Sequence, residues 1–414
     1  MKMRNFLATA LLCCGFAAAQ PFVSGSDGSD GALSYTTPGT YTFDPVALHL
    51  NAAGDNIFNF TTITIASNVT LVLTNANLRG KPVVWLAQGN VNIAGTLSVD
   101  GQSGLTLSNY GADWITYRLP TQPGPGGFPG GVGARPGTPA YPGLGPGGSP
   151  VQTNANCGNG GGASFATVGY GTPVGPTYGN IQTVPLVGGS GGSGGCVPAN
   201  PAADAAGGSG GAGGGAIRIV STTQISVTGR ISANGGGAGY GRNGGTAGGN
   251  GSGGTINLIA PIVTGNGQLY AAGGGGSSYG GGYILLNATT NTFNGSVPYG
   301  IETLRPLLAP PLPTATSVPT VTITSVNGVS VPQPPQGAFQ TPDVTINAAN
   351  AVTINISAAN VPTGTVVKLS IQSELTGDQN ISCTPLAGTL AASTATCSAA
   401  FPTSVSHILA SASW

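Results

Sequence analysis

A repeated spacing of apolar residues runs through much of the chain. Counted from Ile217, apolar side chains fall at offsets 0, 2, 8, 10, 14 and 16, and glycines fall at offsets 12 and 18. The same offsets hold when the count starts at Val83. A third copy starts at Ile256 with one residue deleted, and a partial fourth copy starts at Ile284. Upstream, the first four offsets fit Ile63, Ile65, Leu71 and Leu73.

Within each copy, apolar and polar residues alternate in three short runs, which is the period of a β-strand with one buried face. One copy cannot bury its apolar face alone, so we expect the copies to stack with parallel strands about 4.8 Å apart. The spacing therefore predicts an all-β fold, a right-handed parallel β-helix (solenoid) with three strands in each coil. The alternative, a flat antiparallel sandwich, does not need the same turn spacing in successive copies.

Glycine-rich runs follow the last offset of each copy, over residues 101–215, 235–254 and 273–282. Insertions at one corner of a solenoid emerge on one face of the molecule. Their glycines and prolines recur every third residue, as in GGSGGSGG at 188–195, and this is the polyproline II period. We hypothesise that extended segments pack side by side. A disordered loop is the alternative for most of 101–215.

Changes in residue composition along the chain predict the domain boundaries. Lys2 and Arg4 precede an apolar run, which predicts a secretory signal peptide over residues 1–19 and an extracellular or cell-surface location. The β-helix with its insertions is expected over 20–304, a proline-rich linker over 305–317, and an immunoglobulin-like β-sandwich over 318–414. No later segment holds the roughly 18 apolar residues of a membrane span.

The charge of the chain limits the partners it is expected to bind, and its cysteines indicate the cellular compartment. Charged residues make up 5% of the chain and show no basic patch, which argues against nucleic acid as a partner. Four cysteines follow the signal peptide, and an even number in an exported chain predicts two disulfides. Pairing of neighbours, Cys157 with Cys196 and Cys383 with Cys397, is the simplest of three connectivities. The second pair is too close in sequence for the usual intersheet bridge, so we expect it to join adjacent strands or one hairpin.

Acidic residues offer few sites for chemistry. Asp27 and Asp30, in GSDGSDG, are candidate calcium ligands, with a solvated turn as the alternative, and no other cofactor is expected. The outward positions of the aligned strands are small or amide residues, with Arg218 as the one charged side chain. The pair of carboxylates needed for glycoside hydrolysis cannot be assembled there. The remaining acidic candidates, Asp100, Asp113 and Asp204, lie at a corner or in the long loop, so we predict no catalytic residue.

Several tyrosines lie within the glycine-rich runs. Tyrosine among glycine and serine resembles the composition of a binding loop, in which rigid aromatic rings make the contacts. The alternative is that the rings fasten the loops to the scaffold. The candidate ligand-contact residues are Tyr141, Tyr170, Tyr178, Tyr240 and Tyr279.

Three stretches carry a family resemblance: GSDGSDGALSYTTPGTYTFDP, NIFNFTTITIASNVTLVL, and GGGAIRI with SANGGG. Over residues 24–290 the chain resembles secreted, glycine-rich parallel β-helix proteins of Gram-negative environmental bacteria, and its scaffold is similar to that of adhesins. The resemblance supplies no catalytic residue. We therefore expect a secreted or cell-surface structural or adhesive protein whose partners are extracellular glycans or surface proteins. The alternative is a polysaccharide-active β-helix hydrolase or lyase with an accessory sandwich domain.

Overall fold

The computed structural model describes most of the chain after the predicted signal peptide. The described residues are 22–51, 54–106, 120–152, 157–199, 202–305, 319–333, 335, 342–373, 379–401, 406–412 and 414. The predicted signal peptide and Asp113 lie outside them. Every helix or strand assigned within these ranges is a β-strand, so this part of the chain is all-β. None of the described residues belongs to a helix that could cross a membrane.

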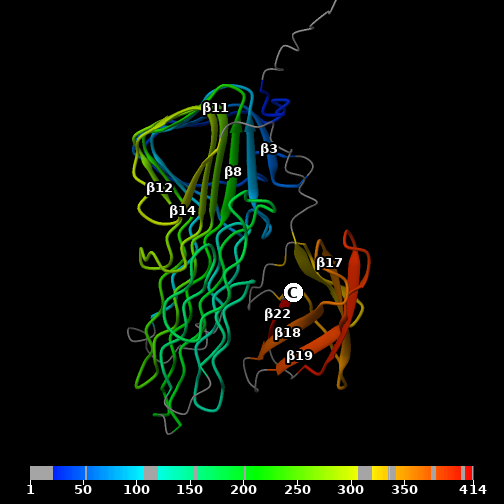
Figure 1. Cartoon of the computed structure of the whole chain (residues 1–414). Helices are drawn as coiled ribbons and strands as arrows, with labels where there is room; N and C mark the ends of the chain where they lie inside the picture. Colours follow the sequence, from blue (N-terminus) through cyan, green and yellow to red (C-terminus); the bar gives the residue numbers. More distant parts are fainter. Residues whose placement is uncertain are drawn as a thin grey trace, which may run out of the picture.

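Two parallel sheets make up the strand region (Figure 1). The larger sheet has nine strands: β1 (Gly31–Tyr35), β3 (Ile57–Ile65), β5 (Val83–Ala87), β6 (Val91–Ile93), β8 (Ala216–Ser221), β9 (Gln224–Val227), β11 (Thr255–Gly265), β13 (Tyr283–Phe293) and β14 (Ile301–Arg305). The smaller sheet has five: β2 (Gly39–Thr42), β4 (Val69–Val72), β7 (Thr96–Ser98), β10 (Arg230–Ser232) and β12 (Gln268–Tyr270).

The predicted right-handed parallel β-helix is wrong. The strands form separate parallel sheets, and six strands of the larger sheet close a ring in the order β11-β8-β5-β3-β6-β9, with β11 also paired to β9. The reason lies in β3 and β11. β11 runs without a break through the corner that the repeat placed between Leu258 and Val263, and β3 is similarly long, so each pairs with two successive strands of an adjoining copy. The first and second runs of each copy therefore belong to one closed sheet.

The register joins residues that share an offset in the later copies. Ile217 pairs with Val83 on one side and with Ile256 on the other. The upstream copy was aligned wrongly, because Ile63 pairs with Val91 in the second run and not with Val83 in the first. Short alternating runs all share a period of two, so a shift by one whole strand preserves the apolar pattern. The neighbour of Trp85 is instead Phe58, which lies earlier in β3.

The inward side chains of the strand region form one apolar core. Its largest members are four aromatic residues whose ring centroids lie 5.1 to 6.1 Å apart in tilted, stacked and edge-on pairs. All four are fully buried: Phe43, Phe58, Phe60 and Trp85. Aliphatic side chains from successive strands continue this core along the stack. Burial of this apolar surface is the main stabilising term for the strand region.

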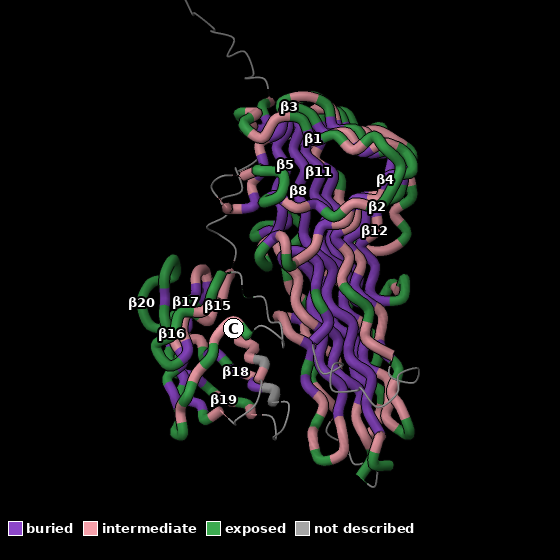
Figure 2. The backbone as a smooth tube through the Cα atoms, turned by 180° about the vertical axis from the view of Figure 1, so that it is seen from behind, coloured by how far each residue is buried: buried purple, intermediate pink, exposed green. Residues whose placement is uncertain are grey.

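The glycine-rich runs form an ordered bundle that extends from one end of the strands (Figure 1). Each segment is extended and assigned to no strand, yet its interior is as buried as the strand core (Figure 2). The hypothesis of packed segments is therefore confirmed over the described residues. We call residues 120–149, 157–171, 186–196, 205–215, 235–254 and 273–282 the glycine bundle.

Segment 205–215 shows how the glycine bundle is held together. Every third N–H group donates to the same neighbouring segment, because a polyproline II chain turns once in three residues. One neighbour accepts from Gly207, Gly210 and Gly213 at Ala134, Gly131 and Phe128; a second accepts from Gly208, Gly211 and Gly214 at Thr246, Gly249 and Ser252. A side chain is excluded where the backbones meet, since a Cβ atom on Gly210 would overlap the carbonyl oxygen of Gly192.

The C-terminal residues form two antiparallel sheets that enclose their own apolar core. One sheet contains β16 (Val329–Ser330), β15 (Thr320–Val326), β17 (Val352–Ala359), β21 (Ser393–Ala399) and β20 (Ala387–Gly388); the other contains β19 (Gln379–Pro385), β18 (Val366–Ser373) and β22 (Ser406–Ala412). The disulfide Cys383–Cys397 joins β19 to β21. It therefore connects the two sheets, and the expected link within adjacent strands or one hairpin is wrong. The return of the chain through the short strand β20 brings the two cysteines face to face.

Candidate functional site

The five candidate tyrosines divide into buried and exposed groups. Tyr141 is only 5% exposed, and Tyr178 donates its hydroxyl hydrogen to the carbonyl oxygen of Gly188 at 2.7 Å. Ser190 donates to the same hydroxyl at 2.9 Å, and the ring of Phe165 lies 4.5 Å away. Burial raises the pKa of Tyr178 above its usual range. These two tyrosines fasten the glycine bundle, as the alternative interpretation proposed.

Tyr170 and Tyr279 instead form an exposed aromatic pair. Their ring centroids lie 5.2 Å apart, and the two residues are 66% and 54% exposed. They come from two segments of the glycine bundle that are joined by backbone contacts. Gly280 donates to the carbonyl oxygen of Val168 at 2.8 Å, and Gly281 donates to the hydroxyl of Thr167 at 2.7 Å. The two rings are therefore held together on an ordered support.

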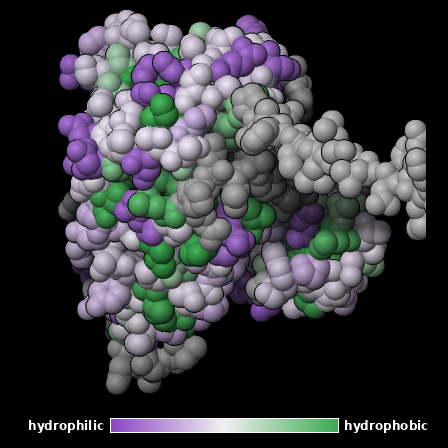
Figure 3. Space-filling view, turned by 45° about the horizontal axis from the view of Figure 1, so that its top comes forward, coloured by the Kyte–Doolittle hydropathy of each residue, from purple (hydrophilic) through white to green (hydrophobic). Residues whose placement is uncertain are grey.

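Tyr240 is exposed on a different segment. It is 67% exposed, and its backbone N–H donates to the hydroxyl of Thr106 at 3.3 Å. Of the five candidates, the structure thus brings two together as a pair, leaves one exposed elsewhere and uses two as internal contacts. On the face of the molecule in Figure 3, hydrophobic side chains lie in several separate patches.

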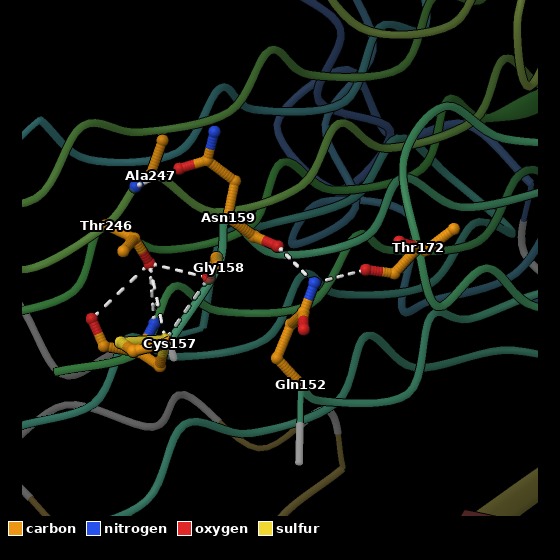
Figure 4. Close-up of a disulfide and its surroundings, with 8 residues drawn as sticks. Gln152, Cys157, Gly158, Asn159, Thr172, Thr246 and Ala247 are labelled. Atoms are coloured by element: carbon orange, nitrogen blue, oxygen red, sulfur yellow. Dashed lines mark hydrogen bonds between the residues drawn. A yellow bond between two sulfur atoms is a disulfide. The ribbon is translucent and has the colours of Figure 1, made fainter. Parts of the chain in front are cut away.

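The disulfide Cys157–Cys196 is the covalent link within the glycine bundle (Figure 4). Both cysteines lie beside Thr246, whose hydroxyl accepts from the N–H of Cys196 and donates to the carbonyl of Gly158, each at 2.9 Å. Gln152 reinforces the neighbouring segment through bonds to the carbonyls of Asn159 and Thr172. The pairing predicted from sequence is confirmed. By closing 39 residues of separation it contributes roughly 4 kcal/mol in the loop-entropy treatment.

The carboxylates of Asp27 and Asp30 accept hydrogen bonds from backbone N–H groups. Asp27 accepts from the N–H of Ser29 at 2.9 Å, and Asp30 accepts from the N–H groups of Asn51 and Asn59, each at 2.6 Å. Asp27 thus caps its own turn, whereas both carboxylate oxygens of Asp30 bond to backbone more than 20 residues away along the chain. Among the described residues no three His, Cys, Asp or Glu side chains gather in a possible metal site.

Two further carboxylates, elsewhere in the structure, also accept hydrogen bonds from neighbouring residues. Asp100 accepts from the hydroxyl of Ser232 at 2.9 Å and from the N–H of Asn234 at 2.6 Å. Asp204 forms an ion pair with Arg242 at 3.1 Å, and the amide of Asn243 donates to the same oxygen. Hydrogen bonds from Asn243 and Arg242 lower the pKa of Asp204. Asp100 and Asp204 therefore bond to different partners, on β10 with the segment after it and on Arg242 with Asn243.

Arg218 does not point to solvent as the alternation predicted. It is 4% exposed, and its guanidinium donates to the carbonyl oxygen of Thr183 at 2.9 Å. Asn257, its neighbour in β11, donates to the hydroxyl of the same threonine at 2.6 Å. Segment 183–187 covers this outer sheet face, with Leu186 packed beside Val220 in a second apolar cluster. Burial lowers the pKa of Arg218 to about 10, so the side chain keeps its charge at neutral pH.

A row of polar residues in the smaller sheet was not among the candidates predicted from the sequence. Thr70, Thr96, Arg230 and Gln268 pair across β4, β7, β10 and β12. Their signal in the sequence is a shared polar offset: Thr96, Arg230 and Gln268 each lie directly after the corner glycine in their copy of the repeat. Comparison with known proteins adds no further site: no protein family, curated protein or solved structure matches this chain.

Proposed function

We propose that the protein acts outside the cytoplasm as a structural and adhesive protein, and that the glycine bundle presents the Tyr170–Tyr279 pair to extracellular glycans. The observation that carries the proposal is an exposed aromatic pair on an ordered, internally hydrogen-bonded support. Aromatic rings of tyrosine combine an apolar face with a polar hydroxyl, which suits the mixed surface of a sugar ring.

The order of the support strengthens this proposal. A flexible loop loses conformational entropy when it binds, whereas rings that are already positioned lose little. Here the N–H of Gly162 donates to the carbonyl oxygen of Tyr170, and the N–H of Gly280 donates to that of Val168, so backbone bonds hold the segments of both tyrosines before any ligand arrives. The two disulfides of the chain are compatible with an extracellular location.

The experiment compares three forms of the chain on an array of extracellular glycans. We expect the wild type to bind, and the double variant Tyr170→Ala/Tyr279→Ala to bind at least about tenfold more weakly, because each ring contributes contact area in the same place. Tyr240→Ala is the matched control, since it removes an equally exposed tyrosine outside the pair. Binding of the double variant at wild-type strength, or no glycan bound by the wild type, would contradict the proposal.

A further inference from the structure

A polar groove crosses the strand region at the corners that lead into the smaller sheet. Its volume is about 530 Å³. It is lined by residues from four successive corners: Asn68, Val69, Thr70, Ala94, Gly95, Thr96, Thr228, Gly229, Arg230, Asn266, Gly267 and Gln268. The glycine bundle leaves the strands after β7, β10 and β12, so the groove lies at their opposite ends.

The strand register makes the groove linear. Thr70, Thr96, Arg230 and Gln268 occupy paired positions on four parallel strands. With neighbouring strands about 4.8 Å apart, this row spans about 14 Å. Each strand thus offers one hydroxyl, guanidinium or amide group in a straight line. Such a periodic row of donors and acceptors suits an extended polymer of polar units.

The charge of the groove indicates which polymer. Arg230 is the one charged residue in its lining, and no carboxylate lines it. The guanidinium carbon lies 4.3 Å from the centroid of the Tyr270 ring, and this cation–π contact orients the group. No ion pair of Arg230 is found among the described residues. The groove is therefore complementary to a ligand that carries an anion among neutral hydroxyl groups.

We infer that this groove binds a linear acidic polysaccharide, with Arg230 paired to the carboxylate of a uronate unit and with Thr96 and Gln268 bonded to the hydroxyls of neighbouring units. Arginine suits this role because its planar guanidinium matches a carboxylate in two parallel hydrogen bonds. The site is separate from the Tyr170–Tyr279 pair and does not depend on its function.

The test measures binding of the full chain to polygalacturonate by calorimetry, with its fully methyl-esterified form as the neutral polymer. We expect binding to polygalacturonate that weakens with salt, and Arg230→Gln to weaken it about tenfold or more. Arg79→Gln is the matched control, since it removes an exposed arginine outside the groove. Arg230→Lys keeps the charge and loses the planar fork, so its affinity should lie between those of wild type and Arg230→Gln.

The outcomes separate this inference from the proposed function. Unchanged binding by Tyr170→Ala/Tyr279→Ala would place the acidic polymer away from the aromatic pair, as expected. The inference is overturned if the wild type does not bind polygalacturonate, if it binds the methyl-esterified polymer equally well, or if a folded Arg230→Gln protein binds as tightly as the wild type. Matching thermal unfolding curves establish that this variant is folded.

Discussion

The strand region and the glycine bundle alternate along the chain but are held together by different interactions. In the strand region, alternate side chains point inward and fill a core of aliphatic and aromatic groups. In the glycine bundle, the segments approach so closely that the interior consists of backbone, with serine hydroxyls such as those of Ser190 and Ser193 bonded to it. A buried interior can therefore be held together by backbone hydrogen bonds where its positions are occupied by glycine.

The two regions should therefore respond differently to the same kind of substitution. Adding a methyl group inside the glycine bundle should be severe, because the obstacle is backbone that cannot turn away. Removing methyl groups should be severe in the strand region, where the lost contacts are apolar. Two measurements examine this contrast, and a third tests the buried tyrosine that packs beside the glycine bundle.

The largest effect is expected for Gly210→Ala. The new methyl group overlaps the carbonyl oxygen of Gly192, so the free energy of unfolding should fall by more than about 4 kcal/mol, beyond the usual range for overpacking. Gly237→Ala is the control, because its nearest neighbours lie at an ordinary 3.7 Å. Urea unfolding of both variants measures the difference. Equal stability of the two would show that the glycine bundle adapts easily and would break the contrast.

A smaller effect is expected for Ile93→Ala in β6. The side chain is fully buried, so its truncation should lower the free energy of unfolding by about 3 kcal/mol. Asn92→Ala, the exposed neighbour on the same strand, should change it by less than about 0.5 kcal/mol. Hydrogen exchange of residues 188–215 in the Ile93→Ala protein sharpens the comparison. Faster exchange there would mean that the glycine bundle unfolds together with the strands.

The smallest effect is a change in pH dependence at Tyr178. Burial raises its pKa in the folded state, so above pH of about 10 the unfolded chain loses a proton that the folded chain retains. Folding stability should therefore fall with rising pH, by up to about 1.4 kcal/mol per pH unit for this one group. Tyr178→Phe should reduce that slope, and Tyr170→Phe, at an exposed ring, should not. Urea unfolding at pH 9 and pH 11 measures both slopes; identical slopes in all three proteins would contradict the assignment.

Much of the local structure is determined by the sequence. The apolar offsets identify inward residues such as Leu97 and Ile231, which pair and are fully buried. The three-residue period of glycine indicates extended packed segments, and the cysteine spacing gives both disulfides. These features depend on side-chain period, backbone conformation and short covalent loops, all of which are properties of nearby residues.

Only the tertiary structure decided how these parts combine. The length of β3 and β11 closes the larger sheet into a ring, because nothing in a period of two marks where a strand ends. Segment 183–187 covers Arg218 across 35 residues of sequence, and the hydroxyl of Tyr283 donates to the carbonyl oxygen of Tyr178 across 105. The same long-range packing pairs Tyr170 with Tyr279 and aligns Arg230 with Thr96 and Gln268. Alternation predicts which side of a strand is polar, but only the folded chain determines whether that side meets water, a covering segment or another ring.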